Sequence, residues 1–307
     1  MKTIKAVVGV LRNKNQEILI AQRKQSQFMG GFWELPGGKQ EMEESPEQAL
    51  IRELKEELDI QVEHLSIQQT MTHHYQDRIV ELDTYNIDHY QKTPQGAEGQ
   101  KIAWVKITDL NNYKLLPTVK PIINSITLPD KYWITPSSDH SSKAWMDKLE
   151  QKLIQGIKLI QLRSKITLDS TIIDKVRDKC QQYNVTLLLN TPAKDFNQTH
   201  GDGWHITTNE MLILSTRPCA NDKLLGASTH NLAEALKAQA MGADFIVISP
   251  VQATQTHPNT VPLGWDNAID VVNKLNIPVY FLGGMGIQDL DKARKLGAQG
   301  IAGVSAF

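Results

Sequence analysis

Residues 37–60, GGKQEMEESPEQALIRELKEELDI, constrain the fold more than any other stretch of this chain. A glycine pair opens the stretch, an acidic loop follows, and a helix-forming run completes it. Ser45 is a favourable N-cap, Pro46 suits the first helical position, and Gln48 stands where it completes a capping box. The pattern therefore predicts a tight turn at the glycine pair and a helix over 45–58.

The predicted helix has two distinct faces. At about 100° per residue its apolar side chains share one face; these are Leu50, Ile51, Leu54 and Leu58. A second face carries Glu53, Glu56 and Glu57, whose like charges repel one another at this spacing. Because Arg52 and Lys55 lie to the side of this face, we expect the carboxylates to lack basic partners and to bind a cation. Oxygen ligands of this kind select Mg²⁺, with Mn²⁺ as the alternative.

Length and charge exclude several classes of protein. The 307 residues are enough for two domains, each with its own core. With 33 Lys and Arg against 34 Asp and Glu, the net charge is −1, so we expect neither stable nucleic-acid binding nor membrane-surface binding. The apolar run 6–11 is too short to span a membrane, and Cys180 and Cys219 are far apart, which suits a reduced compartment. We therefore expect a cytoplasmic protein, of an oligomeric state that the sequence leaves open.

Strand and helix patterns indicate a first α/β domain over residues 1–127. Runs rich in Val and Ile predict strands at 4–11 and 17–21, and further strands lie between 62 and 110. A helix is expected over 118–126. The sequence LPDK at 128–131 is typical of a short linker, so the second domain is expected to span 132–307.

The stretch 37–60 resembles the Nudix box, in which a glycine is followed at fixed spacings by acidic, basic and apolar residues. The positions in register are Gly38, Glu44, Arg52, Glu53, Leu54, Glu56, Glu57 and Ile60. Asp59 stands where the family has a helix-ending glycine, and Asp tolerates the left-handed conformation better than most residues. Including the loop 98–100, the first domain resembles the MutT-type Nudix hydrolases. That resemblance implies an α/β/α sandwich with a mixed sheet.

The same resemblance implies a Mg²⁺-dependent hydrolase that converts 8-oxo-dGTP to 8-oxo-dGMP and pyrophosphate, an antimutator activity. The implied catalytic residues are Glu53, Glu57 and Glu98. The implied metal ligands are Gly38, Glu53, Glu56, Glu57 and Glu98. The residues implied to contact the nucleotide are Arg23, Lys39 and Val119. The chemistry agrees, because cleaving a phosphoanhydride needs charge neutralisation on the phosphoryl oxygens and a positioned water.

Short apolar runs alternate with helix-period segments over residues 132–307. The runs lie at 132–135, 159–163, 186–190, 203–206, 224–228, 245–249, 279–282 and 300–304. The helical segments lie at 142–155, 168–183, 231–241 and 288–296. Eight strands with helical crossovers predict a parallel (β/α)₈ barrel of the TIM type. Because the sequence ends at Phe307, we expect this barrel to lack most of its last helix.

Several motifs in the second half resemble thiamine-phosphate synthase and its relative, the thiazole tautomerase. They include YWIT at 132–135, QLRSK at 161–165, GDGWHI at 201–206 and FLGGMG at 281–286. The resemblance implies contacts with a thiamine-related phosphate from Arg163, Lys165, Ser228, Gly283 and Gly284.

Three further positions depart from the two resemblances and leave alternatives open. Thr191 replaces a Mg²⁺-binding Asp of the synthase, and His257 replaces a phosphate-binding Lys. The barrel is therefore either catalytic, with His205 or His257 moving a proton, or a non-catalytic ligand-binding module. In the first domain, Val119 stands where MutT-type proteins read the purine edge with Asn. The alternative substrate is a diphosphate of the thiamine pathway.

Overall fold

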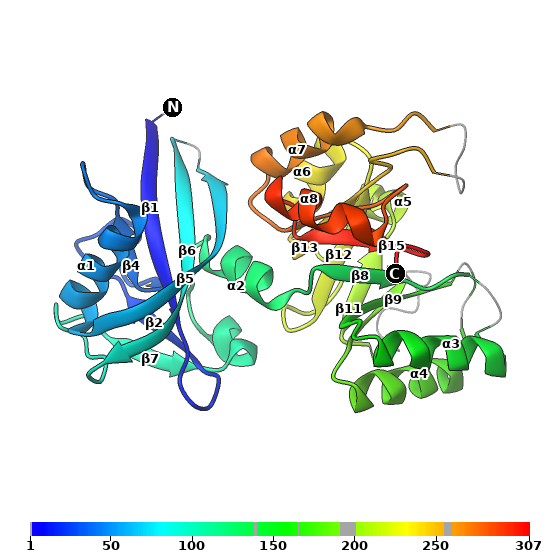
Figure 1. Cartoon of the computed structure of the whole chain (residues 1–307), viewed down its shortest axis with the longest axis horizontal. Coiled ribbons are helices and arrows are strands. Elements are labelled where there is room, and N and C mark those ends of the chain that lie inside the picture. The colour runs from blue at the N-terminus through cyan, green and yellow to red at the C-terminus, as the bar shows by residue number, and fades with distance from the viewer. Residues whose placement is uncertain are drawn as a thin grey trace. The chain divides into compact units, whose positions relative to one another are not determined.

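The computed structural model describes residues 2–75, 77–137, 140–164, 166, 168–190, 201–254 and 260–307. Figure 1 traces the chain from its first strand, drawn in blue, to the last barrel elements, drawn in red. The chain divides into two compact units, Met1–Ile126 and Thr127–Phe307. The strand β8 begins at Lys131, the last residue of the predicted linker.

The first unit contains a larger and a smaller sheet. Its strands are β1 Lys2–Leu11, β2 Ile18–Gln22, β3 Trp33–Glu34, β4 Gly37–Lys39, β5 Gln61–His74, β6 Arg78–Gln91 and β7 Ile102–Val105. The larger sheet has the order β4-β1-β6-β5 and the smaller one the order β3-β2-β7. Strands β1 and β6 run parallel, whereas β1 with β4 and β5 with β6 run antiparallel. The larger sheet is therefore mixed, as the resemblance implied.

Helices α1 (Pro46–Leu58) and α2 (Val119–Thr127) cover opposite faces of the larger sheet. Successive side chains of a strand point to opposite faces, so β1 contributes to two cores. Val7 and Leu11 pack in the core under α1, whereas Val10 packs in the core under α2. A short 3₁₀ helix, η1 (Ile107–Asn112), precedes α2. This arrangement is the expected α/β/α sandwich.

Helix α1 begins and ends as its sequence predicts. The Ser45 hydroxyl accepts a hydrogen bond from the Gln48 backbone N–H (3.2 Å), and the Gln48 side chain accepts one from the Ser45 N–H (2.8 Å). At the C-terminus Asp59 adopts the left-handed conformation, with φ 52° and ψ 32°. Its carboxylate accepts hydrogen bonds from Lys92 (2.6 Å) and Gln95 (3.1 Å), contacts that a glycine could not make.

The second unit is a closed barrel of eight parallel strands. They are β8 Lys131–Ile134, β9 Leu159–Arg163, β10 Thr186–Asn190, β11 Gly203–Ile206, β12 Leu224–Thr229, β13 Phe245–Ile248, β14 Val279–Phe281 and β15 Gly300–Gly303. Each strand pairs with the next along the chain, and β15 pairs with β8. All eight strands fall on the predicted apolar runs, so the predicted barrel is confirmed.

Helices follow most of the barrel strands. They are α3 Lys143–Ile154, α4 Ser170–Gln182, α5 Thr208–Ile213, α6 Leu232–Ala240, α7 Gly264–Lys274, the 3₁₀ helix η3 Ile287–Asp289, and α8 Leu290–Lys295. Helices α5 and α7 were not predicted from the sequence. Residues 304–307, after β15, form no helix. Among the helices that the structure describes, none has both the length and the apolar character needed to cross a bilayer.

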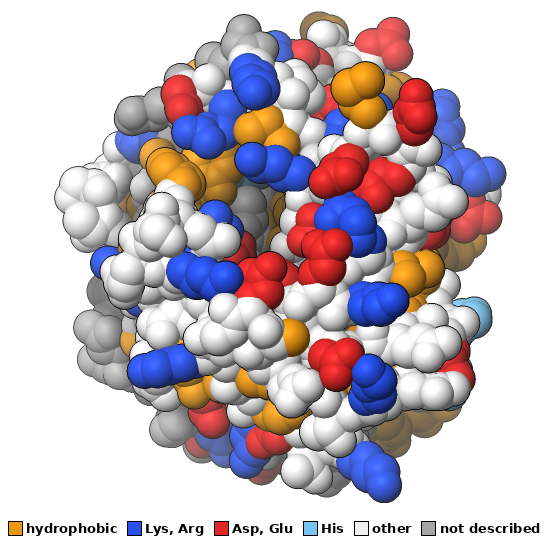
Figure 2. All heavy atoms as spheres, turned by 90° about the vertical axis from the view of Figure 1, so that its left-hand side faces the viewer, with side chains coloured by type: hydrophobic (Ala, Val, Ile, Leu, Met, Phe, Trp, Pro, Cys, Tyr) orange, Lys and Arg blue, Asp and Glu red, His pale blue; other side chains and the backbone are white. Residues whose placement is uncertain are grey.

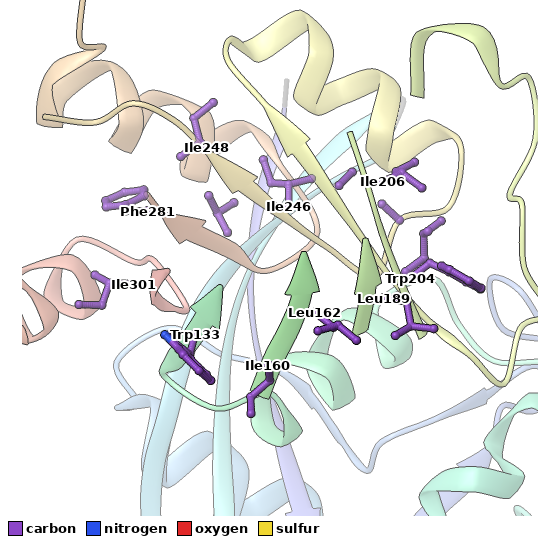
Figure 3. Close-up of a cluster of buried hydrophobic side chains, with 14 of the residues drawn as sticks. Trp133, Ile160, Leu162, Leu189, Trp204, Ile206, Ile246, Ile248, Phe281 and Ile301 are labelled. Carbon is purple, nitrogen blue, oxygen red and sulfur yellow. The ribbon is translucent and has the colours of Figure 1, made fainter. Parts of the chain in front are cut away.

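The barrel core has an outer and an inner layer. Figure 3 shows strand side chains of the outer layer, among them Trp133, Ile160, Leu162 and Phe281. These side chains pack in one cluster with residues of the surrounding helices. The inner layer fills the barrel and includes Tyr132, Leu188, Phe245 and Tyr280. Aromatic rings that pack edge to face therefore occupy the interior.

Candidate functional site

A cleft of about 740 Å³ opens in the first unit. Its lining comes from β1, β4, β6, α1 and α2, together with the segments around Phe28 and Tyr75. The face drawn in Figure 2 shows a hollow that is bordered by acidic and by basic side chains. The cleft thus brings together residues as far apart in the sequence as Ile4 and Ile122.

The pairing of the strands locates the two ends of the cleft. On β1, Val8 lies opposite Gly37 of β4, and Ile4 lies opposite Val80 of β6. Four residues of strand separate these two points, which corresponds to about 13 Å. One end of the cleft therefore lies at the glycine turn, and the other lies where β6 begins.

Four glutamates line the cleft near the glycine turn: Glu34 of β3, Glu41 of the loop after β4, and Glu53 and Glu57 of α1. The pKa of Glu57 is raised to about 8, chiefly by burial and to a smaller degree by the neighbouring charges of Glu34, Glu53 and Glu98. The Gly37 N–H donates to the Glu57 Oε2 at 3.1 Å, which acts in the opposite direction. Burial also raises the pKa of Glu53 and of Glu34. These carboxylates are therefore concentrated where a cation would relieve their repulsion.

The backbone of Gly38 lies directly against the Glu53 carboxylate. A Cβ built on Gly38 would come within 2.2 Å of the Glu53 carboxyl carbon and 2.3 Å of its Oε1. Any side chain at this position would therefore displace the carboxylate. The Glu53 and Glu57 carboxylates supply oxygen ligands of the kind that Mg²⁺ prefers, so these residues fit the metal that the sequence implied.

Arg52 contradicts one expectation from the sequence, that the helix carboxylates lack basic partners. Its guanidinium donates to Glu44 at 2.7 and 3.1 Å, to Glu53 at 2.9 Å and to Glu56 at 3.4 Å. Neighbours in a helix sequence do not normally face each other, but the long Arg52 side chain folds back far enough to reach Glu53. Within the described residues, no three His, Cys, Asp or Glu side chains are arranged closely enough to hold a metal as they stand.

The loop that carries Glu98 is fastened to α1. The Gln100 side chain donates to the Glu57 carbonyl at 2.7 Å, and the Ala97 N–H donates to the same oxygen at 2.9 Å. Glu98 itself is exposed and forms an ion pair with Lys24 at 2.9 Å. Its charge reaches Glu57, whose pKa it helps to raise, although Glu98 does not line the cleft.

The three nucleotide-contact residues expected from the sequence all line the cleft. Arg23 is anchored to Glu34 at 2.5 Å and to the Phe28 carbonyl at 2.8 Å. Lys39 lies on β4 with an exposed side chain. Val119 is only 1% exposed and packs in the core under α2.

The side chains at the end of the cleft where β6 begins were not predicted from the sequence. They are Phe28, Tyr75, Arg78 and Thr118. Phe28 meets the Tyr75 ring edge to face at 6.5 Å, and the Arg78 guanidinium lies 4.7 Å from the centre of the Phe28 ring. Glu34 was missed too, although its place just before the LPGG turn is a local signal.

The expected barrel residues lie at the carboxyl ends of strands. Arg163 ends β9, and its N–H donates to the buried Thr135 hydroxyl at 3.0 Å. Gly283 and Gly284 follow β14 with φ of 92° and 68°; a Cβ on Gly283 would lie 2.6 Å from the Pro250 side chain. The expected residues Lys165, Thr191 and His257 lie outside the described residues.

A chain of hydrogen bonds crosses the barrel interior and ends at Ser228. The Gln161 Nε2 donates to the Tyr132 hydroxyl at 3.2 Å. The Tyr132 hydroxyl lies 3.0 Å from the His205 Nδ1, and the His205 Nε2 lies 2.8 Å from the Ser228 Oγ. Burial lowers the pKa of His205 to about 3, with a smaller effect from Arg163. His205 is therefore neutral and bonded at both ring nitrogens, so it suits a structural histidine better than the proton carrier considered from the sequence.

Comparison with known proteins gives two matches that together cover nearly the whole chain. Residues 131–307 match thiamine monophosphate synthase, and residues 7–125 match the NUDIX domain. Putative thiamine-phosphate synthase 2 of Aquifex aeolicus is 33% identical over 183 residues, which is 59% of this chain and 98% of that protein. The 8-oxo-dGTP diphosphatase of Escherichia coli is 37% identical over 123 residues, which is 40% of this chain and 95% of that protein.

A solved structure also resembles the first unit. It comes from a study of MutT from Aliivibrio salmonicida and Vibrio cholerae, and it is 38% identical with a TM-score of 0.36. The match covers 41% of this chain and 97% of that one. Through its barrel the chain belongs to the thiamine monophosphate synthase family. Its first unit is a Nudix hydrolase domain with MutT-type relatives.

Proposed function

We propose that the first unit is a Mg²⁺-dependent pyrophosphohydrolase that converts 8-oxo-dGTP to 8-oxo-dGMP and pyrophosphate, and so removes an oxidised nucleotide from the pool. The observation that carries the proposal is the convergence of Glu53, Glu57 and the Gly37–Gly38 turn on one cleft. The 8-oxo-dGTP diphosphatase named above supports the choice of substrate, because it is similar over almost its full length.

The proposed metal ligands are the carboxylates of Glu53, Glu56, Glu57 and Glu98 and the carbonyl of Gly38. When bound, Mg²⁺ supplies charge neutralisation on the phosphoryl oxygens and favours ionisation of a water. Glu53 is the proposed residue that orients or deprotonates this water, because it lies against Gly38 and is half-buried. Glu57 and Glu98 are proposed to complete the catalytic set, with Glu57 held by the Gly37 N–H.

The remaining residues at this end are proposed to hold the substrate. Lys39 projects from β4 at the cleft, where its ammonium suits a phosphate. Arg23 is proposed to contact a phosphate or to fix Glu34, with which it is already paired at 2.5 Å. Arg52 has a supporting role, because it joins the loop at Glu44 to the helix at Glu53.

The test compares two variants of the full chain in which one glutamate becomes glutamine. Glu57→Gln removes a proposed ligand, and we expect kcat/KM for 8-oxo-dGTP to fall by about 100-fold or more. Glu63→Gln, on the exposed surface of β5 and outside the cleft, is the matched control and should keep wild-type activity. Equal activity of the two variants would refute the proposal.

A second substrate is supported by Val119 and by the barrel itself. Val119 offers no hydrogen bond to a purine, and the barrel belongs to a family of thiamine monophosphate synthases. We therefore propose a diphosphate of the thiamine pathway as the alternative substrate of the cleft. A panel of 8-oxo-dGTP and thiamine-pathway diphosphates separates the two, since the true substrate should have the higher kcat/KM.

For the barrel we propose a site for a thiamine-related phosphate at the carboxyl ends of its strands. Arg163, Ser228, Gly283 and Gly284 lie at these ends, where barrels of this type bind phosphate groups. Lys165 is proposed to join them. Turnover of thiamine-pathway substrates would show a catalytic barrel, whereas binding without turnover would show a ligand-binding module.

A further inference from the structure

The end of the cleft where β6 begins has an apolar floor. Ile4 of β1, Val80 of β6 and Val119 and Ile122 of α2 line it, and Val119 and Ile122 are each only 1% exposed. Phe28 and Tyr75 add two aromatic rings. Such a surface binds a flat ring system by burying its apolar area and by stacking against it. It does not by itself select among the polar groups of that ring.

Two hydroxyls supply polar atoms at this end. The Tyr75 hydroxyl is hydrogen-bonded to the Thr118 side chain, and both residues line the cleft. Tyr75 lies three residues before β6, and Thr118 immediately precedes α2. The two loops therefore meet at this pair. The nearby Arg78 guanidinium is held by Asp77, with the shorter contact at 2.5 Å.

Hydroxyls differ from an amide in how they recognise a ring edge. Each hydroxyl both donates and accepts, and its hydrogen rotates to suit the partner, whereas an amide has a fixed donor side and a fixed acceptor side. Guanine presents a bare N7 acceptor at this edge, while 8-oxoguanine carries a hydrogen on N7. A hydroxyl pair can meet either form, so it gives little discrimination between them.

On the basis of the proposed function, we infer that Tyr75 and Thr118 form the base-contacting pair of the cleft and make it tolerant of the purine edge. The substrate class is then guanine nucleoside triphosphates, oxidised and unoxidised alike. Val119 lies under the pair as an apolar floor residue and makes no hydrogen bond to the ring.

The test measures kcat and KM of the full chain for 8-oxo-dGTP and dGTP, with Mg²⁺ present. For the wild type we expect the two kcat/KM values to lie within about tenfold of each other. Tyr75→Phe keeps the ring contact with Phe28 and removes the hydroxyl. It should raise KM for both substrates by about tenfold and leave kcat nearly unchanged, as expected for binding that is equal in ground and transition states.

Further variants sharpen the result. Thr118→Val should resemble Tyr75→Phe, and the double variant should lose less than the sum of the two, because the hydroxyls act as one unit. Val119→Asn introduces a fixed amide and should widen the ratio between the two substrates. Tyr90→Phe removes a hydroxyl of the same unit outside the cleft and should leave both substrates unaffected. The unfolding midpoint of every variant should also be measured. A midpoint equal to that of the wild type would exclude misfolding as the cause of a changed KM.

Each alternative outcome has a distinct meaning. Wild-type preference for 8-oxo-dGTP above about a thousandfold, or a Tyr75→Phe variant with wild-type KM, would overturn the inference and leave the proposed hydrolase intact. Hydrolysis of neither triphosphate by the wild type would overturn both.

Discussion

At the residue scale, Arg52 decides how the acidic face of α1 is arranged. Its contacts with Glu44, Glu53 and Glu56 hold these carboxylates beside one cation. Glu57 instead accepts a hydrogen bond from the Gly37 N–H at 3.1 Å. Glu53 and Glu57, four positions apart, therefore have different hydrogen-bond partners, although burial raises the pKa of both.

His205 provides a residue-scale prediction on pH. Burial lowers its pKa to about 3, so the unfolded chain, with a histidine pKa near 6.5, binds a proton that the folded barrel does not. Its contribution to stability is fully present above about pH 6.5 and is lost as the pH falls towards 3. From pH 7 to pH 5 we expect this group to lower the free energy of unfolding of the barrel by about 2 kcal/mol.

Chemical denaturation at several pH values measures this effect. The His205→Gln variant should be less stable at pH 7 but should lose that part of the pH dependence. A variant whose stability falls with pH as steeply as the wild type would contradict a neutral, buried His205.

At the scale of elements, the contact between β4 and α1 shapes the acidic end of the cleft. Gly38 pairs with Val7 of β1, which fixes the strand so that the glycine faces Glu53. We predict that Gly38→Ala displaces the Glu53 carboxylate, because the new Cβ would stand 2.2 Å from its carboxyl carbon. Weaker Mg²⁺ binding should follow, with a loss of kcat/KM of about tenfold or more.

Isothermal titration of the variant with Mg²⁺ measures this loss directly. The far-ultraviolet circular dichroism spectrum should stay unchanged, because β4 remains paired. Wild-type affinity for Mg²⁺ in Gly38→Ala would mean that the backbone and carboxylate at this point do not form the metal site.

Helices and strands that a short stretch of sequence specifies could be predicted. Contacts that depend on how distant segments pack together could not. Helix α1 was predictable because Ser45, Pro46 and Gln48 specify its start within four residues. The barrel strands were predictable because each is a short apolar run. Tyr75 and Thr118 are 43 positions apart and meet only because the loop before β6 packs beside the loop before α2, so no local pattern reveals the pair. Whether the Arg52 guanidinium reaches Glu53 depends on the rotamer of its side chain, and the spacing of residues in the sequence does not determine that rotamer.

At the scale of the whole molecule, each unit has its own hydrophobic cores. The clusters under α1 and α2 contain residues of the first unit alone, and the outer barrel cluster contains residues of the second unit alone. A domain with its own core can unfold as a separate cooperative unit.

We therefore predict two thermal transitions, of which Mg²⁺ shifts only one. At a concentration of about 100 times its Kd, a ligand stabilises the unit that binds it by about 2.7 kcal/mol. Differential scanning calorimetry of the full chain should show one transition that rises with Mg²⁺ and one that does not. In Glu57→Gln the first transition should lose this response. A single transition, or an equal shift of both, would contradict independent units.

The proposed reaction of the first unit is cleavage of a nucleoside triphosphate with pyrophosphate as the leaving group. Phosphorus NMR of the full chain with 8-oxo-dGTP and Mg²⁺ tests it most directly. We predict that 8-oxo-dGMP and pyrophosphate appear in equal amounts and that neither forms at a comparable rate in Glu57→Gln. Release of orthophosphate with 8-oxo-dGDP, or no turnover of 8-oxo-dGTP at all, would contradict the account.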